Sequence, residues 1–497
     1  MTAYDTLQNR FRRLHALNEA AGVLHWDMST MMPSGGAQAR TEQLAVLSVT
    51  SHELLVDPQM RDLFEAAEQE SGLQQDTWRQ ANLREMRRRW RHATALDADL
   101  VEATMKACKS CEMIWREARP KGDFAAVLPA LGEVLKLSRE AATAKAEVFD
   151  CSMYDALLDQ YEPGGSSETI DDIFDDLAEF LPHLLSDVLD WQSQKPEPLA
   201  LEGPFPLDAQ EALAREMMQA VGFNFEHGRL DVSLHPFCGG VPDDVRITTR
   251  YDSDDFMKAL MGVLHETGHA LYERGLPQDW RLQPVGEARG MAVHESQSLL
   301  IEMQACRSAE FMAFAAPLAR QAFGTEGAAW TPENLLAVYN QVKPDFIRVD
   351  ADEVTYPAHV ILRYRLEKAL IEDEMPLAEL PEAWNEGLGE LLGITPPDDS
   401  LGCLQDIHWF DGAWGYFPTY TLGAMAAAQL FAAAKAAEPD IPADIAKGDF
   451  SRLMAWLGTN VHAKGSLLTT DELLEQATGK SLDVEIFKGY LANRYLN

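Results

Sequence analysis

The stretch FMKALMGVLHETGHALYERG, residues 256–275, predicts one helix that carries two histidines on the same face. Serine and aspartate side chains that can cap a helix stand directly before it, and Gly275 provides a stop signal at its end. Phenylalanine, leucine and valine recur at helical spacing and supply a buried side. Because His265 and His269 lie four residues apart, their rings project one turn apart and can bind a single tetrahedral ion.

The remaining groups of such a metal site can be sought around this helix. Glu266 leaves the helix too far round to bind the same ion, but it can reach a water molecule beside it. A catalytic zinc takes three protein ligands, and the third candidate is Glu295, in a helix predicted from Glu287 to about Arg307. His294 competes with Glu295, but neighbours on a helix point about 100° apart, so only one can face the ion. A His-His-Glu set is common in peptidases, which favours Glu295.

The composition indicates a soluble globular protein with a large core. Of 497 residues, 46% are hydrophobic and 24% charged, so the fold needs no metal or disulfide to hold it together. A metal is therefore expected to be functional. The formal net charge of -37 argues against binding to nucleic acid or to an anionic membrane surface. The N-terminus lacks the apolar core of a signal peptide and no apolar run is long enough to span a membrane, so we expect a cytoplasmic protein.

Helical periodicity dominates the chain and predicts a mainly α fold. The first half contains five candidate helices, at residues 3–26, 38–54, 77–115, 123–150 and 168–193. We expect a single domain over residues 1–497. The proline-rich stretch from Lys195 to Pro206 is its best internal boundary, between an N-terminal helical lobe (about 1–200) and a catalytic lobe (about 201–497).

Two short segments alternate between polar and apolar residues, as strands do. Leu230 to Tyr251 predicts a hairpin whose turn is CGGVPD, with Arg246 and Asp244 on one face of the second arm. Phe346 to Tyr356 predicts a further strand, with Arg348, Asp350 and Asp352 sharing a polar face. Two polar faces on either side of a metal motif favour a cleft wall over a solvated sheet.

Six motifs occur in a fixed order along the chain: HPF (235–237), DVRIT (244–248), HETGH (265–269), HESQ (294–297), IRVDAD (347–352) and GCLQDIHW (402–409). In this order they resemble the carboxypeptidase Taq family of metallocarboxypeptidases. The stretches HWDMSTMMPSGGAQAR (25–40) and GYFPTYTLG (415–423) are similar to that family as well. The resemblance extends over nearly the whole chain.

The resemblance implies a large helical fold with a deep active-site groove, a small β-sheet at its wall, and a homodimer. It implies a metal-dependent carboxypeptidase that hydrolyses the C-terminal peptide bond of peptides with broad specificity. Its metal ligands would be His265, His269 and Glu295, which hold one divalent ion per chain. We expect zinc, with cobalt or manganese as alternatives, since such ligands bind several divalent ions.

The resemblance also implies roles around the metal. Glu266 would be the general base for a metal-activated water. Arg348 matches the arginine of the family's motif, and a cation there would suit the terminal carboxylate of a substrate. Arg246 is the rival carboxylate-binding residue, although the nearby Asp244 can hold it in a structural pair. His408 is the candidate for stabilising the oxyanion, with Tyr420 as a helper or alternative; packing is the competing role for both.

Two questions stay open at this point. Related peptidases often place an aspartate four residues after the metal-binding glutamate to orient the first histidine, but that position here is Leu299. Asp350, Asp352 or Asp406 would have to serve from another segment. The same metal would also suit an oligopeptidase or endopeptidase, whereas an inactive scaffold would have no need of Glu266.

Overall fold

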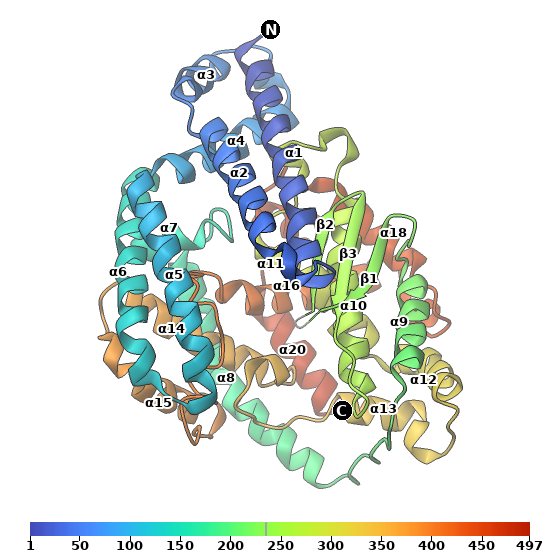
Figure 1. Ribbon diagram of the computed structural model, residues 1–497. Helices are drawn as coiled ribbons and strands as arrows, with labels where there is room; N and C mark the ends of the chain where they lie inside the picture. Colours follow the sequence, from blue (N-terminus) through green and yellow to red (C-terminus); the bar gives the residue numbers. More distant parts are fainter. Residues whose placement is uncertain (234–235) are drawn as a thin grey trace.

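The computed structural model describes residues 1–233 and 236–497 and shows a mainly helical fold around one small sheet (Figure 1), as predicted. The helices before the sheet are α1 (Ala3–Thr30), α2 (Ala37–Leu55), α3 (Gln59–Glu68), α4 (Thr77–Thr94), α5 (Ala98–Ala118), α6 (Phe124–Phe149), α7 (Met153–Leu158), α8 (Ser167–Ser193) and α9 (Leu207–Val221). Those after it are α10 (Phe256–Gly275), α11 (Met291–Leu299), α12 (Ala309–Phe323), α13 (Pro332–Tyr339), α14 (Tyr356–Ile371), α15 (Leu380–Leu392), α16 (Pro418–Ala437), α17 (Ile441–Ile445), α18 (Ser451–Asn460), α19 (Thr470–Thr478) and α20 (Val484–Tyr495). Within the described residues, no helix combines the length and apolarity needed to cross a membrane.

The predicted N-terminal helices are present, with one correction. Residues 77–115 form two helices, α4 and α5, instead of one. Asp97 between them has an extended backbone (φ -71°, ψ 148°) and precedes the first turn of α5. The helix predicted from Glu287 starts only at Met291, after Gly290, and α11 gives way to a π-helix after Leu299.

The sheet has three strands in the order β1-β3-β2. β2 (Phe237–Val241) and β3 (Asp244–Thr249) form an antiparallel hairpin, and β1 (Gly228–Val232) runs parallel to β3. The predicted hairpin therefore had the wrong turn, because CGGV belongs to β2. Gly240 has φ +84°, and a Cβ there would lie 2.2 Å from the carbonyl oxygen of Asp244, so this glycine allows the close hairpin. His235 of the HPF motif lies outside the described residues.

The strand predicted from Phe346 to Tyr356 is wrong. Residues 348–350 form a 3-10 turn, and Asp352 binds backbone amides near it. Its Oδ1 accepts hydrogen bonds from the N–H groups of Val354 and Thr355, both at 3.0 Å, and its Oδ2 accepts one from Lys343 N–H. Aspartates that bind nearby amides favour turns, which overrides the alternation of polar and apolar residues.

Helix α16 lies between the two largest hydrophobic cores. Leu422 and Met425 belong to a core built with α5, α6, α8, α14 and α15, whereas Ala427 and Leu430 belong to a core built with α9, α10, α12 and the sheet. A smaller core joins α1, α3 and α4. The division into two lobes near residue 200 stays a prediction.

A cavity of about 480 Å³ lies between α1, the sheet and the C-terminal end of α10. Its lining includes His15 of α1, Gly240 and Val241 of β2, Glu273 of α10 and His294 of α11. The small sheet therefore forms part of the wall of a hollow at the C-terminal end of the predicted metal helix. Figure 1 shows α1 running alongside this sheet, with α2 packed against the other side of α1.

Candidate metal centre

Helix α10 carries the histidine pair and ends at Gly275, as predicted. Its first turn is fixed by Asp255, whose Oδ1 accepts hydrogen bonds from the backbone N–H groups of Met257 and Lys258. The rings of His265 and His269 lie one turn apart, with their centroids separated by 5.0 Å. The capped helix thus presents both rings on one face.

Two glycines bring Glu295 of α11 to these rings. A Cβ on Gly268 would lie 2.4 Å from the carbonyl oxygen of Gln297 and 2.6 Å from Cα of Ser298, so α10 and α11 are in backbone contact. On the other side, a Cβ on Gly423 of α16 would lie 2.8 Å from Cβ of Glu295. Glu295 is therefore fixed between α10 and α16. Both helices can approach α11 this closely only because they carry glycine at the contact.

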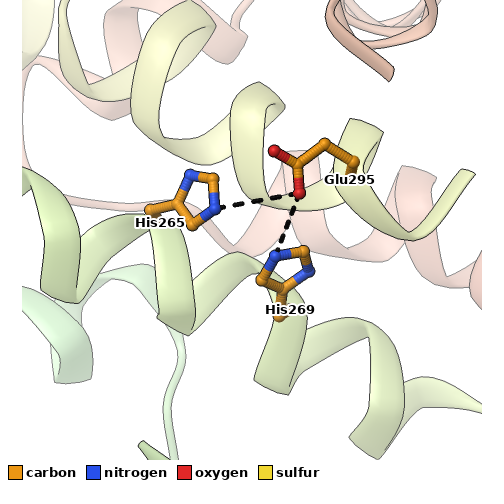
Figure 2. A group of neighbouring side chains, drawn as sticks. All are labelled: His265, His269 and Glu295. Atoms are coloured by element: carbon orange, nitrogen blue, oxygen red, sulfur yellow. Dashed lines mark ion pairs between the residues drawn. The ribbon is translucent and has the colours of Figure 1, made fainter. Parts of the chain in front are cut away.

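Figure 2 shows the three predicted ligands converging on one point. Glu295 Oε2 lies 3.3 Å from His269 Nε2 and 3.9 Å from His265 Nε2. The ligand atoms of the three residues all lie within 4.8 Å of one another. Ligands about 2.0–2.1 Å from a tetrahedral ion are themselves separated by about 3.3 Å, so modest side-chain movement would complete such a site.

The far nitrogens of both rings fix their tautomers. His269 Nδ1 lies 3.1 Å from the carbonyl oxygen of His294, which can only accept a hydrogen bond, so Nδ1 carries the proton. His265 Nδ1 lies 2.9 Å from Glu302 Oε2 and donates to this carboxylate in the same way. Nε2 of each ring is left facing Glu295, where its lone pair can bind a divalent metal after loss of any proton it carries.

Glu302 was missed in the sequence. Of the three aspartates considered for orienting His265, Asp350 pairs with Lys258, Asp352 binds backbone amides, and Asp406 pairs with arginines. None of the three is the observed partner of His265. Its spacing could have indicated it: Glu302 follows Glu295 by seven residues, about two turns of an α-helix, so both side chains lie on the same side.

The charges around the centre favour a cation. Burial opposes ionisation of Glu295, but the neighbouring imidazoles of His265 and His269 hold its pKa at about 2. Burial also opposes protonation of His265, yet Glu295 and Glu302 raise the pKa of this histidine to about 10. The carboxylates thus stabilise positive charge where an ion would bind.

Glu266 lies beside the ligands without being one of the three. Its side chain is nearly buried, and burial raises its pKa to about 7, with the charge of His265 opposing the rise. A carboxyl group with such a pKa can both accept and release a proton near neutral pH.

Arg348 belongs to a cluster in which two arginines share one carboxylate. Its Nε and Nη2 lie 3.1 Å and 3.0 Å from the two oxygens of Asp406, and Arg363 Nε lies 2.7 Å from the same side chain. Burial opposes ionisation of Asp406, but the two guanidinium groups hold its pKa far below the usual range. One negative charge offsets only one of the two positive charges, so the cluster keeps a net positive charge.

His408 and Tyr420 contact each other beside this cluster. His408 Nε2 is 3.3 Å from Tyr420 Oη, and the Tyr420 ring centroid is 4.7 Å from Arg348 Cζ. Burial raises the pKa of the Tyr420 hydroxyl to about 12; the charge of Arg348 lowers this pKa and the charge of Glu295 raises it. Burial lowers the pKa of His408 to about 4, so this imidazole is neutral at pH 7 and can donate one hydrogen bond.

The chain matches a known family of metallopeptidases. The model of the carboxypeptidase Taq (M32) metallopeptidases matches residues 6–495. The chain belongs to this family. It is 38% identical to thermostable carboxypeptidase 1 of Thermus thermophilus, over 99% of this chain and 98% of that protein. It is 36% identical to thermostable carboxypeptidase 1 of Pyrococcus furiosus, over 98% of this chain and 97% of the relative.

A solved structure agrees with this assignment. Metallocarboxypeptidase 1 of Trypanosoma cruzi has a TM-score of 0.97 and 41% identity, with 100% of this chain and 99% of that chain covered. The protein is therefore a metallocarboxypeptidase, a peptide hydrolase of a family that uses a divalent metal.

Two further residues considered for the site, Arg246 and His294, each pair with an acidic side chain. Arg246 Nε lies 3.1 Å from each oxygen of Asp244, and its Cζ lies 4.5 Å from the Trp26 ring, so the structural pair considered for it is present. His294 Nε2 lies 2.9 Å from Glu273, and its ring lines the cavity. Its carbonyl oxygen lies 3.1 Å from His269 Nδ1, and its ring packs against the His269 ring with the centroids 4.5 Å apart.

Replacing Glu302 by glutamine is expected to weaken metal binding to the metallocarboxypeptidase by about 10–100-fold, the usual effect of losing a partner that orients a metal-binding histidine. The amide removes the negative charge that acts on His265. Zinc affinity can be measured by competition with a chromophoric chelator. Asp159→Asn is the control, because it disrupts a carboxylate–histidine pair with His92 that is not part of the centre. Equal zinc affinities in wild type and Glu302→Gln would contradict the assignment.

Proposed function

We propose that this metallocarboxypeptidase removes single residues from the C-termini of peptides with broad preference. We further propose that His265, His269 and Glu295 hold one divalent ion, zinc, with cobalt or manganese as alternatives. The convergence of two Nε2 lone pairs and a carboxylate supports this ligand set. When bound, such an ion would lower the pKa of a water molecule and polarise the scissile carbonyl group.

Glu266 is proposed as the general base. It accepts a proton from the attacking water and passes it to the leaving amine. Its position directly after His265 on α10, together with a pKa raised by burial, supports this role.

The net positive charge of the Arg348 cluster is the observation that carries the proposal of an exopeptidase. A free α-carboxylate must be recognised by a cation, and the chain as a whole repels anions with its charge of -37. Asp406 supplies one negative charge for the two arginines Arg348 and Arg363, so one positive charge of the cluster is not offset. An endopeptidase would have no use for a cation that binds a free α-carboxylate.

His408 is proposed to stabilise the oxyanion, with Tyr420 as its helper. Neutral imidazole donates one hydrogen bond and carries no charge that would compete with Arg348. His408 Nε2 lies 3.3 Å from Tyr420 Oη, so two groups able to donate to a developing oxyanion lie side by side.

We also propose that the enzyme acts on peptides as a homodimer in the cytoplasm and binds no nucleic acid. The strongly acidic composition supports the last point, because phosphate contacts need basic residues.

Arg348→Ala tests the exopeptidase proposal. The variant is expected to lose about 30-fold or more in kcat/KM on free-acid peptides, the effect of removing a charge-assisted contact worth about 2 kcal/mol or more. C-terminally amidated versions of the same peptides should be poor substrates of the wild type and should change little in the variant. Arg348→Lys should recover part of the loss, because an ammonium group cannot form the two-pronged contact.

Arg246→Ala is the control for this experiment, since Arg246 already forms a pair with Asp244. We expect Arg246→Ala to show the same ratio of kcat/KM between free-acid and amidated peptides as the wild type. Equal losses of Arg348→Ala on both kinds of peptide would show that Arg348 only supports the wall of the groove.

A further inference from the structure

The helix that supplies Glu295 continues as a π-helix. After Leu299, residues Leu300–Cys306 form the π-helix η6, a rare conformation that occurs mostly near functional sites. This segment contains Glu302, whose Oε2 binds His265, while its Oε1 lies 2.5 Å from Arg307 Nη2. The orientation of His265 therefore depends on the shape of η6.

The end of η6 is fixed by a residue far away in sequence. Arg494, in the last turn of α20, donates from Nη1 to the carbonyl oxygen of Met303 at 2.8 Å and from Nη2 to the carbonyl oxygen of Arg307. Its Nη2 also lies 3.2 Å from Asn340 Oδ1. One partly buried guanidinium thus binds a carbonyl oxygen within η6 and another at the residue directly after it.

Glu353 strengthens the same contact. It accepts hydrogen bonds from Tyr490 Oη at 2.6 Å and Tyr495 Oη at 3.0 Å, both on α20. It also accepts one from Gln304 Nε2 of η6 at 3.4 Å, and its Oε2 lies 3.6 Å from Arg494 Nε. This buried carboxylate ties α20 to η6 and offsets the charge of Arg494.

We propose that Arg494 is a positioning residue of the metal centre, which fixes the π-helical turn that presents Glu302 to His265. A π-turn has one residue more than an α-turn, and its carbonyl groups need donors from elsewhere. With Arg494 removed, η6 is free to relax toward an α-helix, in which each residue step rotates a side chain by about 100°. Glu302 would then turn away from His265. The inference rests on the proposed function only in taking His265 as a metal ligand.

Thermodynamic linkage gives this proposal a second consequence. If the docking of α20 strengthens metal binding, then metal binding must strengthen the docking of α20 by the same factor. The two effects can be measured separately, and neither needs catalytic turnover.

Arg494→Met tests the proposal through zinc affinity, measured by competition with a chromophoric chelator. We expect the Kd for zinc to rise about 10-fold, the lower end of the range for groups behind a metal ligand. The visible absorption of the cobalt-loaded variant should change, because His265 would leave its orientation. Arg494→Lys should restore part of the affinity, since an ammonium group can reach only one of the carbonyl oxygens well.

Lys488→Met is the matched control. Lys488 lies on the same helix and pairs with Asp176 and Glu485 at 2.5 Å and 3.0 Å, away from η6. This variant should lose thermal stability but keep its zinc affinity and its cobalt spectrum. An equal loss of zinc affinity in Lys488→Met would overturn the proposal, because any weakening of α20 would then have the same effect.

Hydrogen exchange of the wild type covers the case in which Arg494→Met does not fold. Residues 490–497 should exchange more slowly with zinc than with chelator, and unchanged exchange would overturn the proposal. His265→Ala separates this result from the proposed function. If His265→Ala keeps full zinc affinity, the ligand set itself is wrong. If it loses zinc while Arg494→Met does not, only the role of Arg494 is wrong.

Discussion

Glu266→Gln is expected to lower kcat by at least about 10²–10⁴-fold, the range for loss of a general base. The amide has nearly the same shape as the carboxylate but cannot accept a proton from water. Metal binding should persist, because Glu266 lies beside the ligand group without being one of its three members. Stopped-flow or steady-state assays on one blocked dipeptide, with elemental analysis of the same sample, measure both quantities.

Glu273→Gln is the control for this variant. Glu273 lies on the same helix, seven residues further on, and lines the cavity beside His294. It should retain kcat within about tenfold of the wild type, since no proton transfer is assigned to it. If Glu266→Gln, with its metal retained, kept more than a tenth of the wild-type kcat, another residue would have to be the base.

Removing the metal is expected to abolish peptidase activity while leaving the helices folded. The buried apolar residues form cores that extend over most helices and do not depend on the three ligands. Far-ultraviolet circular dichroism before and after chelation measures the helical content, and addition of zinc should restore activity. Full activity after complete metal loss, confirmed by elemental analysis, would rule out the metal-dependent mechanism.

Substitutions of the neighbours His294 and Glu295 accompany this experiment. Glu295→Ala should lose zinc, because its Oε2 lies within 4 Å of both Nε2 atoms. His294→Ala should keep most of it, since the His294 ring packs against His269 but its Nε2 binds Glu273 and does not belong to the ligand group. The reverse pattern would mean that the third ligand is wrongly assigned.

The centre could be predicted where its chemistry depends on local spacing. The four-residue interval between His265 and His269 fixes their common face whatever surrounds the helix. The capping aspartate and Gly275 set the ends of α10 in the same local way. Helix α11 could be predicted for the same reason, although not its π-helical continuation.

Prediction failed where distant segments decide the structure. The alternation at Arg348, Asp350 and Asp352 has the period of a strand. In the structure, however, Asp352 binds nearby amides, Asp350 pairs with Lys258, and Arg348 binds Asp406. The parallel pairing of β1 with β3 and the contact of Arg494 with η6 join segments that no local pattern relates. The spacing from Glu295 could have indicated Glu302, but its contact with His265 depends on a π-helical turn that the sequence pattern does not predict.

The close approach of α10 and α11 restricts how the motif H-E-x-x-H can be used in protein design. In this chain the second variable position is Gly268, and even one methyl group there would collide with the backbone of α11. A designer who grafts the two histidines and Glu266 onto another helix pair would obtain the right residues at too great a separation. Glu295 would then fall short of the ion unless the recipient helices also carry glycine at their crossing point.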